Sequence, residues 1–322
     1  MIDRLHLSID PLAPLEPEFQ RLLTAVPPRR PKRSYYREFR DLRPTLPLNY
    51  YTDGIYTSSN KLELIEVGHL SAAQIWEIMN QVVLDDPLTL AIQRVDLAVD
   101  VPVMTATWFW HHAWIRNKRF HQVWNSAEDP GTVYYGHRNL IRAYDKLAHL
   151  ERLADAGELS HANAQLLALY RSAGCPWTRV ERQLTDGKIP KEINSLGRLF
   201  RNVAEFEPFK SVELFGGGAP DPSEEDCKGL AYFTGLGLRS YAKTHGMQRL
   251  VARLNLNGGH AQAQLRRFAI FLPPSPDEFE PPDLGALFEA SVSQQIGEFY
   301  HHDGLHPATQ IDEGRDCSST VQ

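Results

Sequence analysis

An alternating segment, Leu90–Val101 (LAIQRVDLAVDV), constrains the fold of this chain more than any other feature. Apolar residues occupy every second position of it, which is the period of a β-strand with one buried face. The opposite face carries Arg94, Asp96 and Asp100. We therefore expect a sheet strand that presents charged groups on the side away from the core.

Strand and helix patterns continue on both sides of this segment. A helix is predicted over residues 71–83, strands over 132–136 and 140–144, a polar helical stretch over 147–172, and an alternating strand over 177–184. This order predicts an α+β fold with a central, mostly antiparallel sheet and flanking helices, followed by a helical C-terminal segment.

Composition shifts divide the chain into four parts. Residues 1–50 hold many prolines and a basic cluster (Arg29, Arg30, Lys32, Arg33) and are expected to form an N-terminal arm. Residues 51–215 are expected to form the domain that holds the chemistry. A glycine- and proline-rich linker near 216–222 leads to a helical domain over 222–272. An acidic tail over 273–322 is expected to be partly disordered.

Composition and charge exclude several classes of protein. With 42% hydrophobic and 23% charged residues, the chain can bury a core. Its net charge is −6, but the tail holds ten acidic residues against one base, so the remainder is slightly basic, with 33 bases and 30 acids. No apolar stretch is long enough to span a membrane, and three cysteines are too few for a disulfide framework. We expect a cytoplasmic protein with no membrane partner.

One candidate site is acidic. Asp96 and Asp100 share a strand face but lie roughly 13 Å apart, so either would need Glu181 from a neighbouring strand to hold a hard divalent ion. The same carboxylates could instead form ion pairs with arginines such as Arg94 and Arg179.

A second candidate site is the segment Arg142–Lys146 (RAYDK). On a strand, Arg142, Tyr144 and Lys146 point the same way, so one phenol is flanked by two cations. Positive charge favours the phenolate that attack on a phosphodiester requires, although a lone strand tyrosine more often serves packing. Gly216–Gly218 lacks the lysine of a phosphate-binding loop, and the chain has no His-x-His pair.

Four blocks in order carry a family resemblance: residues 94–100 (RVDLAVD), 132–138 (TVYYGHR), 141–146 (IRAYDK) and 179–184 (RVERQL). Together they resemble the replication initiation factor family, the Rep_trans-type rolling-circle initiators of plasmids and phages. The resemblance covers about residues 60–200. It implies a metal-dependent enzyme that nicks and rejoins a DNA strand at an origin through a covalent phosphotyrosine. It also implies a core distantly related to the initiators that use a histidine pair.

The resemblance assigns roles by position. Tyr144 would be the nucleophile, with Tyr134 or Tyr135 as rivals. Asp96 or Asp100, together with Glu181, would bind Mg²⁺ or Mn²⁺. The basic residues Arg94, Arg138, Arg142, Lys146 and Arg179 would contact DNA or its phosphates.

The expected partner is origin DNA, single-stranded or extruded as a hairpin, and a host helicase and a second copy of the chain are further expected partners. Two other functions fit the same residues. One is a non-catalytic DNA-binding regulator of replication, and the other is a metal-dependent nuclease that uses water as nucleophile.

Overall fold

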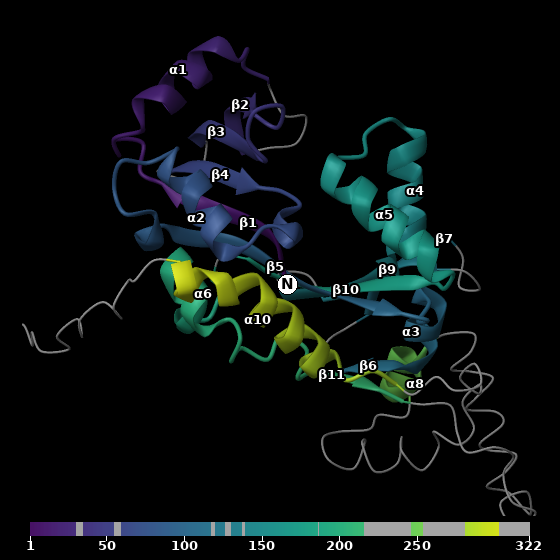
Figure 1. Cartoon of the computed structure of the whole chain (residues 1–322). Coiled ribbons are helices and arrows are strands. Elements are labelled where there is room, and N and C mark those ends of the chain that lie inside the picture. The colour runs from purple at the N-terminus through teal and green to yellow at the C-terminus, as the bar shows by residue number, and fades with distance from the viewer. Residues whose placement is uncertain are drawn as a thin grey trace, which may run out of the picture.

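The computed structural model describes residues 1–29, 35–54, 59–116, 120–125, 130–136, 139–185, 187–215, 246–253 and 281–302. A large antiparallel sheet dominates these parts of the chain (Figure 1). Its strands are β1 (Ile2–Ile9), β2 (Tyr36–Asp41), β3 (Leu48–Gly54), β4 (Asn60–Leu64), β5 (Ala91–Pro102), β7 (Phe120–Asn125), β8 (Pro130–Tyr135), β9 (Asn139–Asp145) and β10 (Trp177–Thr185).

Neighbouring strands of this sheet follow the order β2-β3-β4-β1-β5-β10-β9-β8-β7. Every neighbouring pair is antiparallel. A small separate sheet pairs β6 (Ala113–Ile115) with β11 (Val212–Leu214). The predicted class, an α+β fold with a central antiparallel sheet and flanking helices, is confirmed.

Helices cover the two faces of the sheet unequally. The main core contains side chains from α1 (Pro17–Ala25), α2 (Ala72–Asn80), α3 (Ala106–His112), α6 (Leu196–Asn202) and α10 (Leu284–His302). The helices α4 (Lys146–Asp155) and α5 (His161–Ala173) stand on the opposite side of the sheet from α6 and α10 (Figure 1). The described part also holds α8 (Met247–Arg253) and the short helices η1 (Val67–His69), η2 (Pro87–Thr89) and η3 (Lys191–Ile193).

Local sequence sets several helix boundaries. Ser71 begins α2 with a capping box, in which its hydroxyl and the side chain of Gln74 each bond the other residue's backbone N–H. Asp145 and Ser160 cap α4 and α5 more simply, because only the side chain of the capping residue accepts a hydrogen bond from a backbone N–H of the first turn. Gly174 ends α5 in the left-handed conformation, with a φ of 65°. None of the described helices has the length and apolar character needed to cross a membrane.

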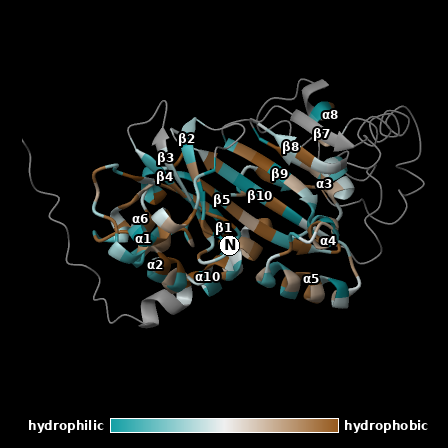
Figure 2. Ribbon diagram, turned by 90° about the horizontal axis from the view of Figure 1, so that it is seen from above, coloured by the Kyte–Doolittle hydropathy of each residue, from teal (hydrophilic) through white to brown (hydrophobic). Residues whose placement is uncertain are grey.

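The alternation along β5 has the predicted outcome. Val95, Leu97, Val99 and Val101 are each at most 1% exposed and belong to the main core. Figure 2 shows apolar and polar residues alternating along β5, β10 and β9. The polar residues of these strands therefore share the face that looks toward α4 and α5.

The expected N-terminal arm is wrong for most of residues 1–50. Strand β1 lies inside the sheet between β4 and β5, and β2 and β3 extend the same sheet. The described prolines of this segment fall in connections or, as Pro17, in the first turn of α1, where the N–H that proline lacks would have no helical acceptor. Most of the basic cluster, residues 30–33, lies outside the described residues.

The acidic tail also departs from expectation. Residues 284–302 form α10, and Phe288, Val292 and Ile296 are buried in the main core. Residues 303–322 lie outside the described part. So do the expected linker at 216–222 and most of the expected helical domain at 222–272, of which α8 is described and is helical.

Candidate active site

The strand register brings the predicted site residues onto one polar face. Across β9, β10 and β5, Tyr144 is opposite Arg179, and Arg179 is opposite Asp100. One pleat further along, Arg142 is opposite Glu181. Since directly opposite residues of an antiparallel pair lie on the same face, these five side chains form one continuous patch.

A cleft of about 890 Å³ lies over this patch. Its floor is the polar face of β8, β9 and β10, and one wall is α5. The cationic residues that line it are Arg4, Arg142, Lys146, Arg152 and Arg179. Asp3, Glu66 and Asp100 supply the acidic lining, so the cleft has more basic than acidic side chains. A concave, cation-rich surface of this size suits a phosphate-bearing ligand.

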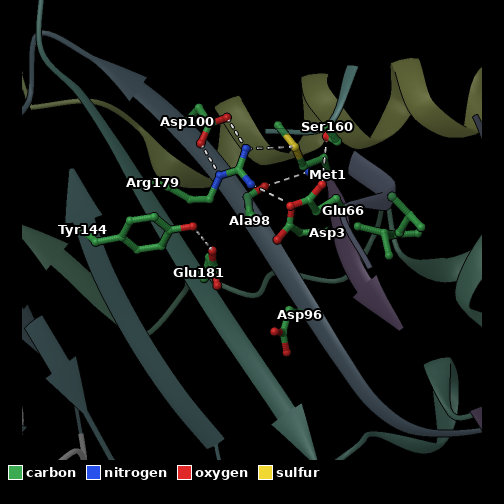
Figure 3. Close-up of polar contacts among 12 residues, drawn as sticks. Met1, Asp3, Glu66, Asp96, Ala98, Asp100, Tyr144, Ser160, Arg179 and Glu181 are labelled. Carbon is green, nitrogen blue, oxygen red and sulfur yellow. Dashed lines mark hydrogen bonds and ion pairs between the residues drawn. The ribbon is translucent and has the colours of Figure 1, made fainter. Parts of the chain in front are cut away.

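Tyr144 and Glu181 are directly connected (Figure 3). The Tyr144 hydroxyl donates a 2.7 Å hydrogen bond to Oε1 of Glu181. The other carboxylate oxygen of Glu181 accepts from the guanidinium of Arg142. Glu181 is fully buried, whereas Tyr144 is half-buried and lines the cleft. The pair therefore places a phenol at the cleft surface with a proton acceptor beneath it.

Burial raises the pKa values of both partners. Burial raises the pKa of Glu181 above its usual value, and the charge of Arg142 only partly offsets this. The pKa of Tyr144 is raised well above 10 by burial and then by the nearby charge of Glu181. The expectation that flanking cations favour a phenolate is therefore not met, and Tyr144 needs a base to take its proton.

Arg179 lies in an ion-pair network below the cleft. Its Nε and Nη2 contact the two oxygens of Asp100 at 2.5 and 2.6 Å, and its Nη1 contacts Asp3 at 2.6 Å. The Tyr170 hydroxyl donates to Asp100 at 2.5 Å. Only 4% of the Arg179 side chain is exposed. The expected DNA contact of Arg179 therefore competes with two carboxylates that already hold it.

The three expected metal ligands are each engaged by arginine. Asp100 pairs with Arg179, and Glu181 pairs with Arg142. Asp96 pairs with Arg94 and is 1% exposed. No three His, Cys, Asp or Glu side chains within the described parts of the chain are grouped so that they could hold a metal ion. Guanidinium groups in contact with every candidate ligand repel a divalent cation, so this arrangement does not fit a resident Mg²⁺ or Mn²⁺.

The remaining predicted residues differ in whether they reach the cleft. Tyr134 lines the cleft, whereas Tyr135 is fully buried against Phe109, which leaves Tyr134 as the rival nucleophile. Lys146 lines the cleft as the first residue of α4, and burial followed by the charge of Arg179 lowers its pKa. Arg138 lies outside the described residues.

Sequence reasoning missed the residues that close the cleft. Asp3 comes from β1, and Tyr170, Leu166 and Leu169 come from α5, all of them outside the four blocks. Leu169 is 58% exposed although it is apolar. The sequence predicted a polar helical stretch over 147–172, but nothing in that stretch indicates which strands the helix faces.

His149 of α4 was also missed. Its ring meets that of Tyr144 edge to face, with centroids 5.6 Å apart. Burial, followed by the charge of Lys146, lowers its pKa to about 4. The imidazole is therefore neutral near pH 7 and adds no charge to the cleft.

Comparison with models of known protein families gives no match. No curated protein matches the sequence. Among solved structures, a rolling-circle replication initiator protein from Geobacillus stearothermophilus aligns over 74% of this chain and 94% of its own, with a TM-score of 0.38 and 15% sequence identity. At this TM-score we carry no residue role across from it.

Proposed function

We propose that this protein cuts and rejoins a strand of DNA through a covalent bond to Tyr144, the reaction of a rolling-circle replication initiator. The observation that supports this most directly is the hydrogen bond from Tyr144 to the buried carboxylate of Glu181, beside a cleft in which basic side chains outnumber acidic ones. A phenol next to a general base, facing bound phosphate, is the arrangement that tyrosine transesterification needs.

Each group has a defined task in the proposed reaction. The Tyr144 oxygen attacks the phosphorus, and its proton passes to Glu181 Oε1, 2.7 Å away. A bond from phosphorus to the tyrosine oxygen forms as the bond to the 3′ oxygen breaks, and that oxygen takes up a proton from water. Arg142 and Lys146 neutralise charge on the non-bridging oxygens.

The products match the needs of replication initiation. The 5′ end stays on Tyr144 as a phosphotyrosine, and the free 3′-hydroxyl can prime synthesis. Attack of a 3′-hydroxyl on the phosphotyrosine reverses the step and rejoins the strand, so no nucleotide hydrolysis is required. The expected helicase and second copy of the chain stay predictions.

The cleft chemistry favours a single strand as substrate. The α5 wall carries Leu166 and Leu169, and Trp177 of β10 lies on the floor. The cations beside them are Arg142 and Arg179 of the floor and Lys146 of α4. Apolar and aromatic surface beside cations accommodates unstacked bases next to phosphates. We infer that an origin is cut where it is unpaired, for example in an extruded hairpin.

The test is a covalent-capture assay. Single strands that cover the DNA around the protein's own coding sequence are labelled at the 3′ end, which stays on the fragment joined to Tyr144. They are incubated with the protein and Mg²⁺ or Mn²⁺, and label is sought on denatured protein. We expect label on the wild type and on Tyr134→Phe, which alters a tyrosine of the same cleft, and none on Tyr144→Phe. Label that persists on Tyr144→Phe but not on Tyr134→Phe moves the nucleophile to Tyr134.

The same assay separates the two alternatives. Cleavage without a protein adduct, unchanged in Tyr144→Phe, favours a nuclease that uses water. Salt-sensitive binding with no cleavage under either metal favours a non-catalytic regulator of replication.

A further inference from the structure

The polar face carries a second tyrosine–glutamate pair in the other half of the sheet. The strand order divides between β1 and β5 into β2-β3-β4-β1 and β8-β9-β10-β5, and the second half has β7 as an additional edge strand beside β8. In each half the inner strand comes first in the chain, a helix follows it, and the next strands return stepwise from the outer edge. The two halves therefore share one topology, although the sequence shows no repeat of fixed period.

The two pairs occupy equivalent positions. Tyr144 is opposite Arg179, and its hydroxyl binds Glu181, two residues beyond that arginine on β10. In the first half, Tyr51 is opposite Lys61, and its hydroxyl donates a 2.6 Å hydrogen bond to Oε2 of Glu63, two residues beyond that lysine on β4.

The direction of the strands supports the same relation. Strands β1 and β5 are antiparallel neighbours, so an approximate two-fold axis perpendicular to the sheet relates the halves and leaves each residue on its own face. Both tyrosines therefore lie on the polar face.

The glutamates of the two pairs have different neighbours. Asn49 occupies the position equivalent to Arg142, opposite Glu63. The other oxygen of Glu63 contacts His6 Nε2 at 2.7 Å. The cleft that Tyr144 lines does not include Tyr51. Tyr51 is therefore not part of the enclosed site.

An aromatic and cationic surface surrounds Tyr51. The rings of Phe39 and Tyr51 lie 4.8 Å apart, and both side chains are half-buried. Lys61 Nζ lies 3.9 Å from the centroid of the Tyr51 ring. Arg4 lines the cleft and belongs to β1, the strand between β4, which carries Lys61, and β5. It therefore lies between the two sites.

We propose that Phe39, Tyr51 and Lys61 form a second binding site for single-stranded nucleic acid, which receives the strand after it passes Arg4 on leaving the cleft. Flat rings and cations on a sheet surface bind bases by stacking and phosphates by charge, and both need unpaired bases. The choice of nucleic acid rests on the function proposed above, whereas the location of the site does not.

Photo-crosslinking of the wild-type protein tests the location. A strand of about 16 nucleotides with 5-iododeoxyuridine at each position in turn is irradiated on the protein, and crosslinked peptides are identified by mass spectrometry. We expect adducts on Phe39 or Tyr51 at one end of the strand and on cleft residues such as Tyr170 or Trp177 at positions nearer the cut site.

The outcomes separate the two proposals. Adducts in the cleft without any at Phe39 or Tyr51 overturn the second site and leave the proposed function standing. An absence of adducts at either place contradicts both. Adducts at Phe39 or Tyr51 alone support the second site and count against the cleft as the place of cleavage.

A charge variant gives an independent measurement. Lys61→Gln should weaken binding of the long strand roughly five-fold and lower the salt slope by about 0.7, the contribution of one phosphate contact on a single strand. Binding of a strand of about 4 nucleotides, held in the cleft, should not change. The control is Lys191→Gln, which alters an exposed lysine on η3. This short helix lies away from the polar face, because its Ile193 packs into the main core on the other side of the sheet. Equal weakening by both variants would contradict the proposal.

Discussion

Arg179 and Asp100 are cross-strand partners on β10 and β5, and they form a two-point ion pair with N–O distances of 2.5 and 2.6 Å. Both side chains are at most 7% exposed. Fork-shaped pairing of this kind fixes the orientation of both groups. The row that contains them also contains Tyr144, opposite Arg179. The ion pair therefore fixes β10 against β5, and β10 in turn pairs with β9, the strand that carries the proposed nucleophile Tyr144.

Removal of Asp100 should destabilise the protein strongly. Asp100→Asn leaves a buried guanidinium with Asp3 as its remaining carboxylate, and loss of one partner of a buried pair costs about 3 kcal/mol or more. The measurement is the free energy of unfolding in urea at pH 7. The control, Glu151→Gln, removes an exposed partner of Arg171 and should cost less than about 1 kcal/mol. Equal effects of the two substitutions would contradict this account of the network.

The same pair gives stability a defined pH dependence. Burial alone would raise the pKa of Asp100, but the charge and hydrogen bonds of Arg179 hold that pKa below its ordinary value of 3.8. A lowered pKa means that the stabilisation is present above pH 3.8 and is lost as pH falls through the lower pKa of the folded state. The stability difference between wild type and Asp100→Asn should therefore be constant from pH 7 to 5 and shrink below pH 3.8. If this stability difference grew as the pH was lowered, the pKa of Asp100 would have to be raised in the folded state, which would contradict the prediction.

Glu181 should control the pH dependence of adduct formation. Glu181 can accept the phenolic proton only when it is ionised, and its pKa is raised. The rate of adduct formation should therefore rise as the pH increases through that pKa. Glu181→Gln should slow formation of the Tyr144 adduct about 10²- to 10⁴-fold and remove this pH dependence. Glu66→Gln changes a carboxylate that lines the same cleft but does not contact Tyr144, and should keep both rate and profile. Single-turnover capture across a pH series measures both.

Much of this site could be predicted from sequence because it lies on strands with a clear period of two. The faces of β5, β9 and β10 follow from alternation alone, and so does the shared direction of Arg142 and Tyr144. Lys146, which was expected on the same strand, is instead the first residue of α4. Which strands are neighbours is a long-range property, and local pattern cannot reveal it. Thus β1, whose Asp3 meets Arg179, was mistaken for part of an arm.

The pairing of charges was equally hidden. Spacing left open whether Asp96, Asp100 and Glu181 bind a metal or pair with arginines, because both outcomes need the same residues on one face. The structure pairs all three with arginines, Glu181 and Asp100 across neighbouring strands and Asp96 with Arg94 on its own strand.

A divalent ion should therefore not bind tightly to the protein alone. Each candidate carboxylate is held by a guanidinium, so a Mn²⁺ titration without nucleic acid, followed by calorimetry or by the electron spin resonance of free Mn²⁺, should show no site tighter than about 1 mM. Glu181→Gln should leave the titration unchanged. A micromolar site that disappears in Glu181→Gln would restore the carboxylates as metal ligands. Any metal requirement of cleavage is then expected only when the strand is present.

Helix α10 should be required for the fold of the sheet domain, because one of its side chains completes the sheet's backbone hydrogen bonding. Gln295 accepts a 2.7 Å hydrogen bond from the Ile2 N–H and donates to the carbonyls of Ile2, Val67 and Leu70 at 3.0 to 3.1 Å. Gln295→Ala leaves these buried groups without that partner, which should lower the free energy of unfolding by about 3 kcal/mol.

The neighbouring glutamine provides a matched control for this prediction. Gln294 is exposed and lines the cleft, so Gln294→Ala should change stability by less than about 0.5 kcal/mol. Urea unfolding followed by tryptophan fluorescence measures both variants. If the two substitutions have the same small effect, the helix is an appendage, as the acidic composition first indicated. A loss confined to Gln295→Ala means that a segment from the acidic end of the chain stabilises the strand that carries Asp3 into the cleft.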